Sequence, residues 1–157
     1  MADPFTEAEK PTPLARKPTE YLTRVSIENL SPLGVFLLAK EGFALSDVYS
    51  MVSLSELYLS WNVIKRIVGK PSRTMQGKND KTTTGRLGVF ESAIAFQYAK
   101  VLEHAMTVFG TLRLAEEWLA KPCRYLDGNI PLDLVGNPLG FQAVEDYLER
   151  VELGVYQ

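Results

Sequence analysis

Residues 88–110 read GVFESAIAFQYAKVLEHAMTVFG, and this stretch decides the fold class. Apolar side chains recur in it at intervals of three and four residues, which is the spacing of one helix face. The pattern predicts the longest helix of the chain, from Gly88 to Phe109, closed by Gly110. Its predicted inward residues are Phe90, Ala93, Ile94, Val101, Leu102, Ala105, Met106 and Val108.

Downstream of this helix the helical spacing continues. A helix over 112–120, ended by Pro122, has the predicted inward residues Leu114, Trp118 and Leu119. Asn137-Pro138 is typical of a helix start, with a polar cap followed by proline in the first turn. The last helix is predicted to run from there to Leu153, with Gly154 behind it and with an inner stripe of Phe141, Val144, Leu148 and Val151. No stretch alternates as a strand would, so we expect an all-α chain.

Upstream, the first twenty residues are rich in proline and poor in large apolar side chains. They cannot bury enough surface to offset the entropy of ordering, so residues 1–20 are predicted to be a flexible tail. Ser31-Pro32 repeats the cap-and-proline pattern and predicts a short, heavily buried helix from Leu33 to Lys40, stopped at Gly42. The stretch 53–59 is left open between helix and extended chain. We therefore expect three parts: a flexible tail at 1–20, a helical region at 21–86, and a C-terminal part at 87–157 that contains the long helix and the helices after it.

Residues 60–77 carry the pattern of a helix-turn-helix. Ser60 is predicted to cap a helix with Val63, Ile64, Ile67 and Val68 on one face, ended by Gly69. A second short helix is predicted from Pro71 to about Gly77, which gives the helix, turn and helix of a DNA-binding motif.

Charge supports that interpretation. Residues 60–86 hold Lys65, Arg66, Lys70, Arg73, Lys78, Lys81 and Arg86 against the single acid Asp80, although the whole chain has a net charge of −2. Because the start of a second helix reads base edges, we expect base contacts from Arg73, Thr74 and Gln76. Phosphate contacts are expected from Lys65, Lys70 and Lys78.

Other classes of protein find little support. The one cysteine, Cys123, excludes an internal disulfide framework and a site built from several cysteines. No apolar run reaches membrane-spanning length, and no signal peptide is evident, so we expect a cytoplasmic protein without a membrane. His104 and Cys123 lie outside any catalytic motif, so we predict no enzyme, no metal and no cofactor.

A set of residues in the last fifty positions resembles a known family. They are Phe109-Gly110, Ala115, Trp118-Leu119, Pro122, Gly128, Pro131, Asp133-Leu134, Gly140, Val144, Leu148, Arg150-Val151-Glu152 and Gly154-Val155-Tyr156. Together they resemble the toxin-binding domain of the Xre/MbcA/ParS-like antitoxins, and the ending is most similar to the ParS type. The segment 60–75 is similar to the Xre-type helix-turn-helix of that family, with Pro71 where the family usually has a capping serine.

The resemblance implies an N-terminal Xre-like helix-turn-helix region followed by a small helical toxin-binding domain. It implies that the partner is a RES-domain toxin that uses NAD, and that the C-terminal helix and tail cover the toxin's NAD cleft. The toxin-binding residues would then be Arg150, Glu152, Gly154, Val155 and Tyr156. A homodimer that represses its own operon is expected on the same basis. The alternative is a free-standing helix-turn-helix transcriptional regulator without a toxin partner.

Overall fold

The computed structural model describes residues 16–69 and 85–154, and within these ranges the regular structure is helical. The α-helices are α2 (Pro18–Thr23), α3 (Pro32–Glu41), α4 (Leu45–Val52), α5 (Glu56–Ser60), α6 (Val63–Val68), α9 (Val89–Phe109), α10 (Leu112–Leu119), α11 (Pro131–Leu134) and α12 (Pro138–Glu152). Two 3₁₀ turns are η1 (Ile27–Asn29) and η2 (Arg124–Leu126). The predicted all-α class is confirmed.

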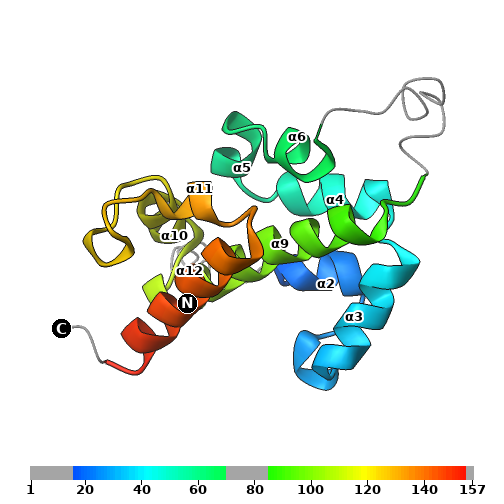
Figure 1. Ribbon diagram of the computed structural model, residues 1–157, viewed down its shortest axis with the longest axis horizontal. Helices are drawn as coiled ribbons and strands as arrows, with labels where there is room; N and C mark the ends of the chain where they lie inside the picture. The colour runs from blue at the N-terminus through cyan, green and yellow to red at the C-terminus, as the bar shows by residue number, and fades with distance from the viewer. Residues whose placement is uncertain (1–15, 70–84, 155–157) are drawn as a thin grey trace, which may run out of the picture.

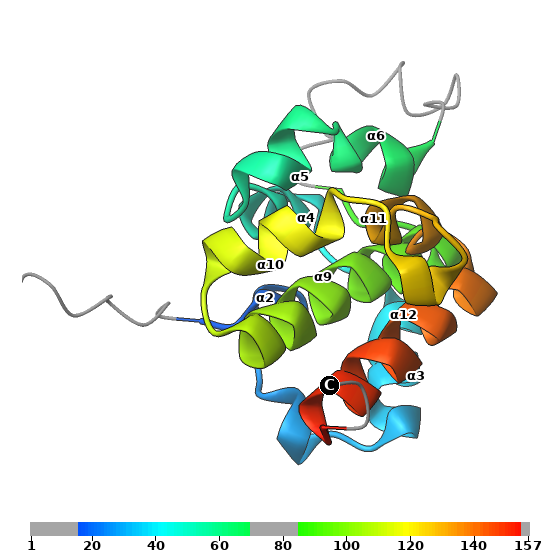
Figure 2. The ribbon, with the colours of Figure 1, turned by 90° about the vertical axis from the view of Figure 1, so that its left-hand side faces the viewer.

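The long helix α9 runs through the middle of the molecule (Figure 1). Helices α4, α5 and α6 lie on one side of it, and α2 and α3 lie on the other. Helices α10 and α12 also pack directly against α9, as the turned view shows (Figure 2). Val101, Leu102 and Ala105 of α9 are fully buried, and they belong to one cluster that includes residues from α4 and α12. A single core is therefore shared by elements from both ends of the chain.

Polar contacts tie α5 to this core. The fully buried Tyr58 donates its hydroxyl to the carbonyl of Tyr98 at 2.7 Å, and the two rings meet edge to face. Glu116 of α10 accepts hydrogen bonds from the Ser55 hydroxyl at 2.7 Å and the Leu57 amide at 2.8 Å. Because Ser55 is the N-cap of α5, the carboxylate of Glu116 closes the start of that helix.

Three residues that were predicted to face inward are exposed. In the first turn of α9, Ser92 is the residue that faces the core, and its hydroxyl accepts a hydrogen bond from the Phe43 amide at 3.0 Å. Phe90 therefore faces away from the core and is 79 % exposed. Ala93 is also exposed for this reason. Leu114 is 41 % exposed, and α10 instead buries Ala115 and Leu119.

Upstream, the structure corrects three predictions and shows that the stretch 53–59, which the sequence left open, is partly helical. The predicted helix after Ser31 is present as α3, but only Ala39 of it is buried, and Leu33, Phe36 and Leu37 are exposed. The stretch 53–59, left open between helix and extended chain, contributes to α5. This helix ends at Ser60, so Ser60 is not the cap of the next helix. Asn62, with φ 54°, begins α6 instead. The flexible tail was predicted to extend to residue 20, but α2 already begins at Pro18.

Candidate functional site

The last helix, α12, presents three of the five residues predicted to bind a toxin. Arg150 and Gly154 are exposed, and the side chain of Glu152 is 45 % exposed, all on the final turn or directly after it. The structure therefore brings Arg150, Glu152 and Gly154 together at one end of the helix. Val155 and Tyr156 lie outside the described residues.

Local hydrogen bonds and packing hold this final turn in place. The Leu153 amide donates to the carbonyl of Glu149 at 2.9 Å, and the Gly154 amide donates to that of Val151 at 3.0 Å. Gly154 has φ 75°, a backbone conformation that glycine adopts without the steric cost of a side chain. On the inward side, Val144 and Leu148 are fully buried. The turn is the end of an anchored helix.

A row of four aromatic rings supports another side of α12. Phe109 contacts Trp118 with ring centroids 5.4 Å apart, Trp118 stacks on Tyr147 at 5.5 Å, and Tyr147 stacks on Tyr125 at 5.7 Å. The row joins the end of α9 to α10, α12 and η2, and it reaches the surface at Tyr125, which is 55 % exposed. Stacked rings at such separations add stability beyond the area that they bury. The row fixes α12 relative to the three elements beside it.

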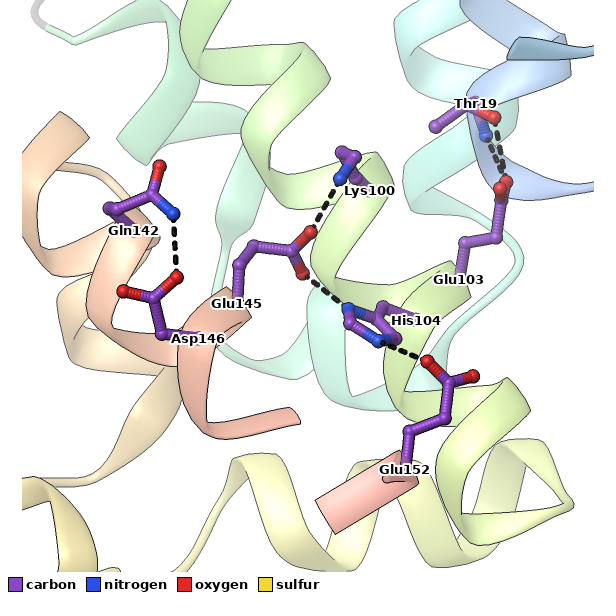
Figure 3. A network of polar contacts seen from close by, with 8 residues as sticks. All are labelled: Thr19, Lys100, Glu103, His104, Gln142, Glu145, Asp146 and Glu152. Carbon is purple, nitrogen blue, oxygen red and sulfur yellow. Dashed lines mark hydrogen bonds and ion pairs between the residues drawn. The ribbon is translucent and has the colours of Figure 1, made fainter. Parts of the chain in front are cut away.

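A polar network links α12 to α9 (Figure 3). Glu145 is buried, and its two carboxylate oxygens contact the Lys100 ammonium at 2.6 Å and Nδ1 of His104 at 3.0 Å. The other ring nitrogen of His104, Nε2, lies 3.4 Å from Oε1 of Glu152. One imidazole therefore bridges two carboxylates that lie two helical turns apart on α12.

The charges in this network stabilise one another. The hydrogen bond to Glu145 raises the pKa of His104 above its usual value, and Glu152 adds to this effect while burial opposes it. Burial raises the pKa of Glu145, but the hydrogen bonds and charges of His104 and Lys100 outweigh burial, so the pKa is lowered overall. Both shifts favour the ionised forms, an imidazolium beside a carboxylate.

The sequence did not predict this network. The sequence places His104 outside any catalytic motif and names no partner for it, and its partner Glu145 lies 41 residues away along the chain. A signal was available in the spacing of Glu145 and Glu152, because seven residues make two helical turns and place both on one face. The spacing alone does not identify His104 as the partner, because that requires knowing that α12 packs against α9.

Of the residues predicted to bind DNA, the structure describes Lys65. It lies exposed on α6, which Gly69 ends as predicted with φ 70°. Lys70, Arg73, Thr74, Gln76 and Lys78 lie outside the described residues, as does the predicted second helix. Beside Lys65, the guanidinium of Arg66 lies 5.2 Å from the centre of the Trp61 ring and 3.3 Å from a carboxylate oxygen of Asp133. This ion pair joins α6 to α11 of the C-terminal segment.

The one histidine and the one cysteine of the chain both lie within residues 16–69 and 85–154. No cluster of three or more histidine, cysteine, aspartate or glutamate side chains there is placed to hold a metal ion. Cys123 is buried in the core, and both nitrogens of His104 face carboxylates. In the same ranges, no helix combines the length and the apolar character that crossing a membrane requires.

The comparison with protein families supports the C-terminal assignment. Residues 104–154 match the antitoxin Xre/MbcA/ParS C-terminal toxin-binding domain. The match begins at His104 and ends at Gly154, so it includes His104, Glu145 and Glu152 of the polar network, the aromatic row and the final turn of α12. No curated protein matches the chain.

Proposed function

We propose that the protein is the antitoxin of a type II toxin–antitoxin system and neutralises a RES-domain toxin, because residues 104–154 match the Xre/MbcA/ParS C-terminal toxin-binding domain. Such a toxin uses NAD, either as an ADP-ribosyltransferase or as an NAD-degrading enzyme. The antitoxin acts by binding and requires no catalytic chemistry of its own.

The observation that supports this proposal best is the final turn of α12. Arg150, Glu152 and Gly154 lie there at the surface, inside the matched segment, on a helix anchored by a buried apolar side and by the His104 network. A rigid helix end loses little conformational entropy when it binds, so its side chains bind a partner more tightly than the same groups on a loose segment.

This arrangement supports neutralisation by occlusion. In the proposal, the end of α12 and the residues after it enter the toxin's NAD cleft, where Val155 and Tyr156 serve as anchors. Tyrosine suits that role because it buries a large area while keeping a polar tip. The segment from Gly110 onward has eight acids against four bases, so a basic rim on the cleft would complement it.

Removal of the tail tests occlusion. Deleting residues 154–157 is expected to weaken binding of the RES-domain toxin from the same operon by on the order of 2 kcal/mol or more, as measured by calorimetry. NAD consumption by the toxin should recover in parallel. Ser50→Ala, an exposed change on α4 across α9 from α12, is the control and should leave both readouts unchanged. If the truncated protein inhibits the toxin as well as the intact one, occlusion by the tail is wrong.

We further propose that the protein binds operator DNA through residues 60–77 and represses its own operon. The support is the concentration of basic residues in 60–86 and the helix pair α5 and α6 directly before the predicted reading helix. Arg73→Ala should lose roughly 1–3 kcal/mol at one base position, whereas Lys78→Ala should weaken binding to all sequences and flatten the salt slope by about 1. Equal affinity for the promoter and for scrambled DNA would reject the autorepressor role.

A homodimer is part of the same proposal, because helix-turn-helix proteins usually read two half-sites about one turn of DNA apart. Light scattering at micromolar concentration is expected to give a dimer, and a larger complex with the toxin. A monomer under both conditions would contradict it. A genome neighbourhood without a RES-domain gene would favour the free-standing regulator instead.

A further inference from the structure

His104 stands at the junction between α9 and the helix that carries the toxin-binding candidates. Its Nδ1 contacts the buried Glu145, and its Nε2 contacts Glu152 on the final turn (Figure 3). On α9 itself, Lys100 also contacts Glu145, while Glu103 is directed to α2, where it accepts from the amide and the hydroxyl of Thr19. The charged groups that face the imidazole from α12 are therefore Glu145 and Glu152.

We propose that His104 is a positioning residue for toxin binding, which fixes the final turn of α12 by holding Glu152 and which releases that turn when it loses its proton. The inference rests on the proposed function, because it assigns a role to the toxin-binding end of the chain.

The chemistry of the imidazole supplies the reason. A protonated imidazole has two N–H donors, so it donates to both carboxylates at once. A neutral imidazole has one donor and one lone pair, and the lone pair repels the carboxylate that it faces. The contact with Glu145 is shorter, at 3.0 Å against 3.4 Å, and lies on a buried carboxylate, so the N–H stays on Nδ1. Glu152 is then the group released.

The direction of the pH effect is set by the two pKa shifts. The pKa of His104 is raised, mainly by the hydrogen bond to Glu145, so its contribution to the fixed state is complete at acidic pH and is lost as pH rises through the pKa of the folded protein. The pKa of Glu145 is lowered by His104 and Lys100, against the effect of burial, so its contribution is lost only when pH falls through that lower value. The final turn is held between these two limits.

The fixed state is also the state that binds. The contact with His104 uses Oε1 of Glu152, and the side chain remains 45 % exposed, so the carboxylate is both oriented and accessible. Orientation before binding lowers the entropy lost in the complex. Toxin affinity is therefore expected to be higher below the pKa of His104 than above it.

The first experiment uses the full-length protein without a toxin. The chain has one histidine, so an NMR titration of its ring signal reports His104 alone. The pKa should lie above the ordinary value and fall in Glu152→Gln. Asp146→Asn is the control, since Asp146 pairs with Gln142 on α12 outside the network, and it should leave the pKa unchanged. An unchanged pKa in Glu152→Gln overturns the proposal.

Amide hydrogen exchange tests the release of the turn. After correction for intrinsic rates, protection of residues 150–154 should fall about two- to fivefold as His104 deprotonates, a range in keeping with one partly exposed ion pair. Residues 141–144, in the first half of α12, should not follow the titration. In His104→Gln, which keeps a neutral donor, exchange should be independent of pH and match the wild type at high pH. If the protection of residues 150–154 in the wild type does not change as His104 deprotonates, the proposal is wrong.

The last experiment measures affinity for the RES-domain toxin of the operon at about one pH unit on each side of the measured pKa. The wild type and Asp146→Asn should lose about two- to fivefold in affinity at the higher pH, and Glu152→Gln should show no such change. Toxin binding with the same pH dependence in Glu152→Gln rejects the positioning role and leaves the proposed function intact. An absence of toxin binding at every pH rejects both.

Discussion

Two helices of this chain begin with almost the same residues, SPLG at 31–34 and NPLG at 137–140. In both, a polar side chain caps the start: Ser31 accepts from the Gly34 amide at 2.9 Å, and Asn137 accepts from the Leu139 and Gly140 amides at 2.8 and 3.2 Å. In both, a proline occupies the first turn and the following leucine is exposed. The starts of α3 and α12 are therefore local features, determined by the same chemistry.

Beyond their first turns the two helices differ in how they pack. A Cβ on Gly140 would lie 2.2 Å from the carbonyl oxygen of Leu134, so α12 packs directly onto the backbone of α11, whereas a Cβ on Gly34 would meet its nearest atoms at 3.4 Å. Helix α12 fully buries Val144 and Leu148, while α3 buries only Ala39 and exposes three large apolar side chains. A capping sequence specifies where a helix begins, and the neighbouring elements decide which of its faces is covered.

The largest difference between the helices should appear when a leucine is shortened in each. Leu148→Ala removes a fully buried side chain and should lower the free energy of unfolding by about 2–5 kcal/mol. Leu37→Ala removes a side chain that is 48 % exposed and should cost less than about 1 kcal/mol. Urea denaturation measures both. A large loss at Leu37 that depended on protein concentration would mean that α3 is covered in a dimer.

A smaller difference is expected at the paired glycines. Gly140→Ala should destabilise the protein by about 1–3 kcal/mol, because α12 must move away from the backbone of Leu134. Gly34→Ala has room and replaces a poor helix former, so it should be neutral or stabilising by up to about 1 kcal/mol. Thermal denaturation of the two variants under identical conditions gives the comparison. Equal destabilisation by both would contradict the packing described for α12.

The smallest difference is expected at the caps. Asn137→Ala removes an acceptor for two amides and should cost about 1–2 kcal/mol, and Ser31→Ala removes an acceptor for one and should cost about 0.5–1 kcal/mol. Asn137→Ser is the matched control, because serine restores a capping oxygen and should recover most of the loss. The order of the two alanine variants in equilibrium unfolding decides whether the second acceptor contact contributes.

The same contrast explains how far the sequence could be interpreted. In α12, apolar residues recur at three- and four-residue spacing with charged residues between them, so its start and its buried Val144 and Leu148 were predicted correctly, and its end within one residue. Helix α3 is apolar on most sides, and nothing in such a run says which side is covered, so its start was correct and its burial was wrong. The cap of α6 was misplaced at Ser60 because the turn depends on Asn62 adopting a left-handed backbone, which serine-based capping rules do not anticipate.

The candidate site divides in a similar way. The predicted residues Arg150, Glu152 and Gly154 are neighbours in sequence, and a helix end brings them together without further information. Their link to His104 depends on the packing of α12 against α9, which joins positions 41 and 48 residues apart. Long-range pairing of this kind has no local signal in one sequence.

The two tryptophans can serve as separate fluorescence probes, one for the region of α5 and α6 and one for the C-terminal segment. The chain has two, Trp61 and Trp118. Trp61 lies at the end of α5 with the guanidinium of Arg66 5.2 Å from the centre of its ring, and Trp118 is stacked on Tyr147 within the matched C-terminal segment. Replacing one tryptophan at a time with phenylalanine would leave a single tryptophan, either in α10 or at the end of α5. Emission from Trp118 should respond when a protein partner covers α12, and emission from Trp61 should respond when DNA approaches α6, so the two binding events could be followed separately in one solution.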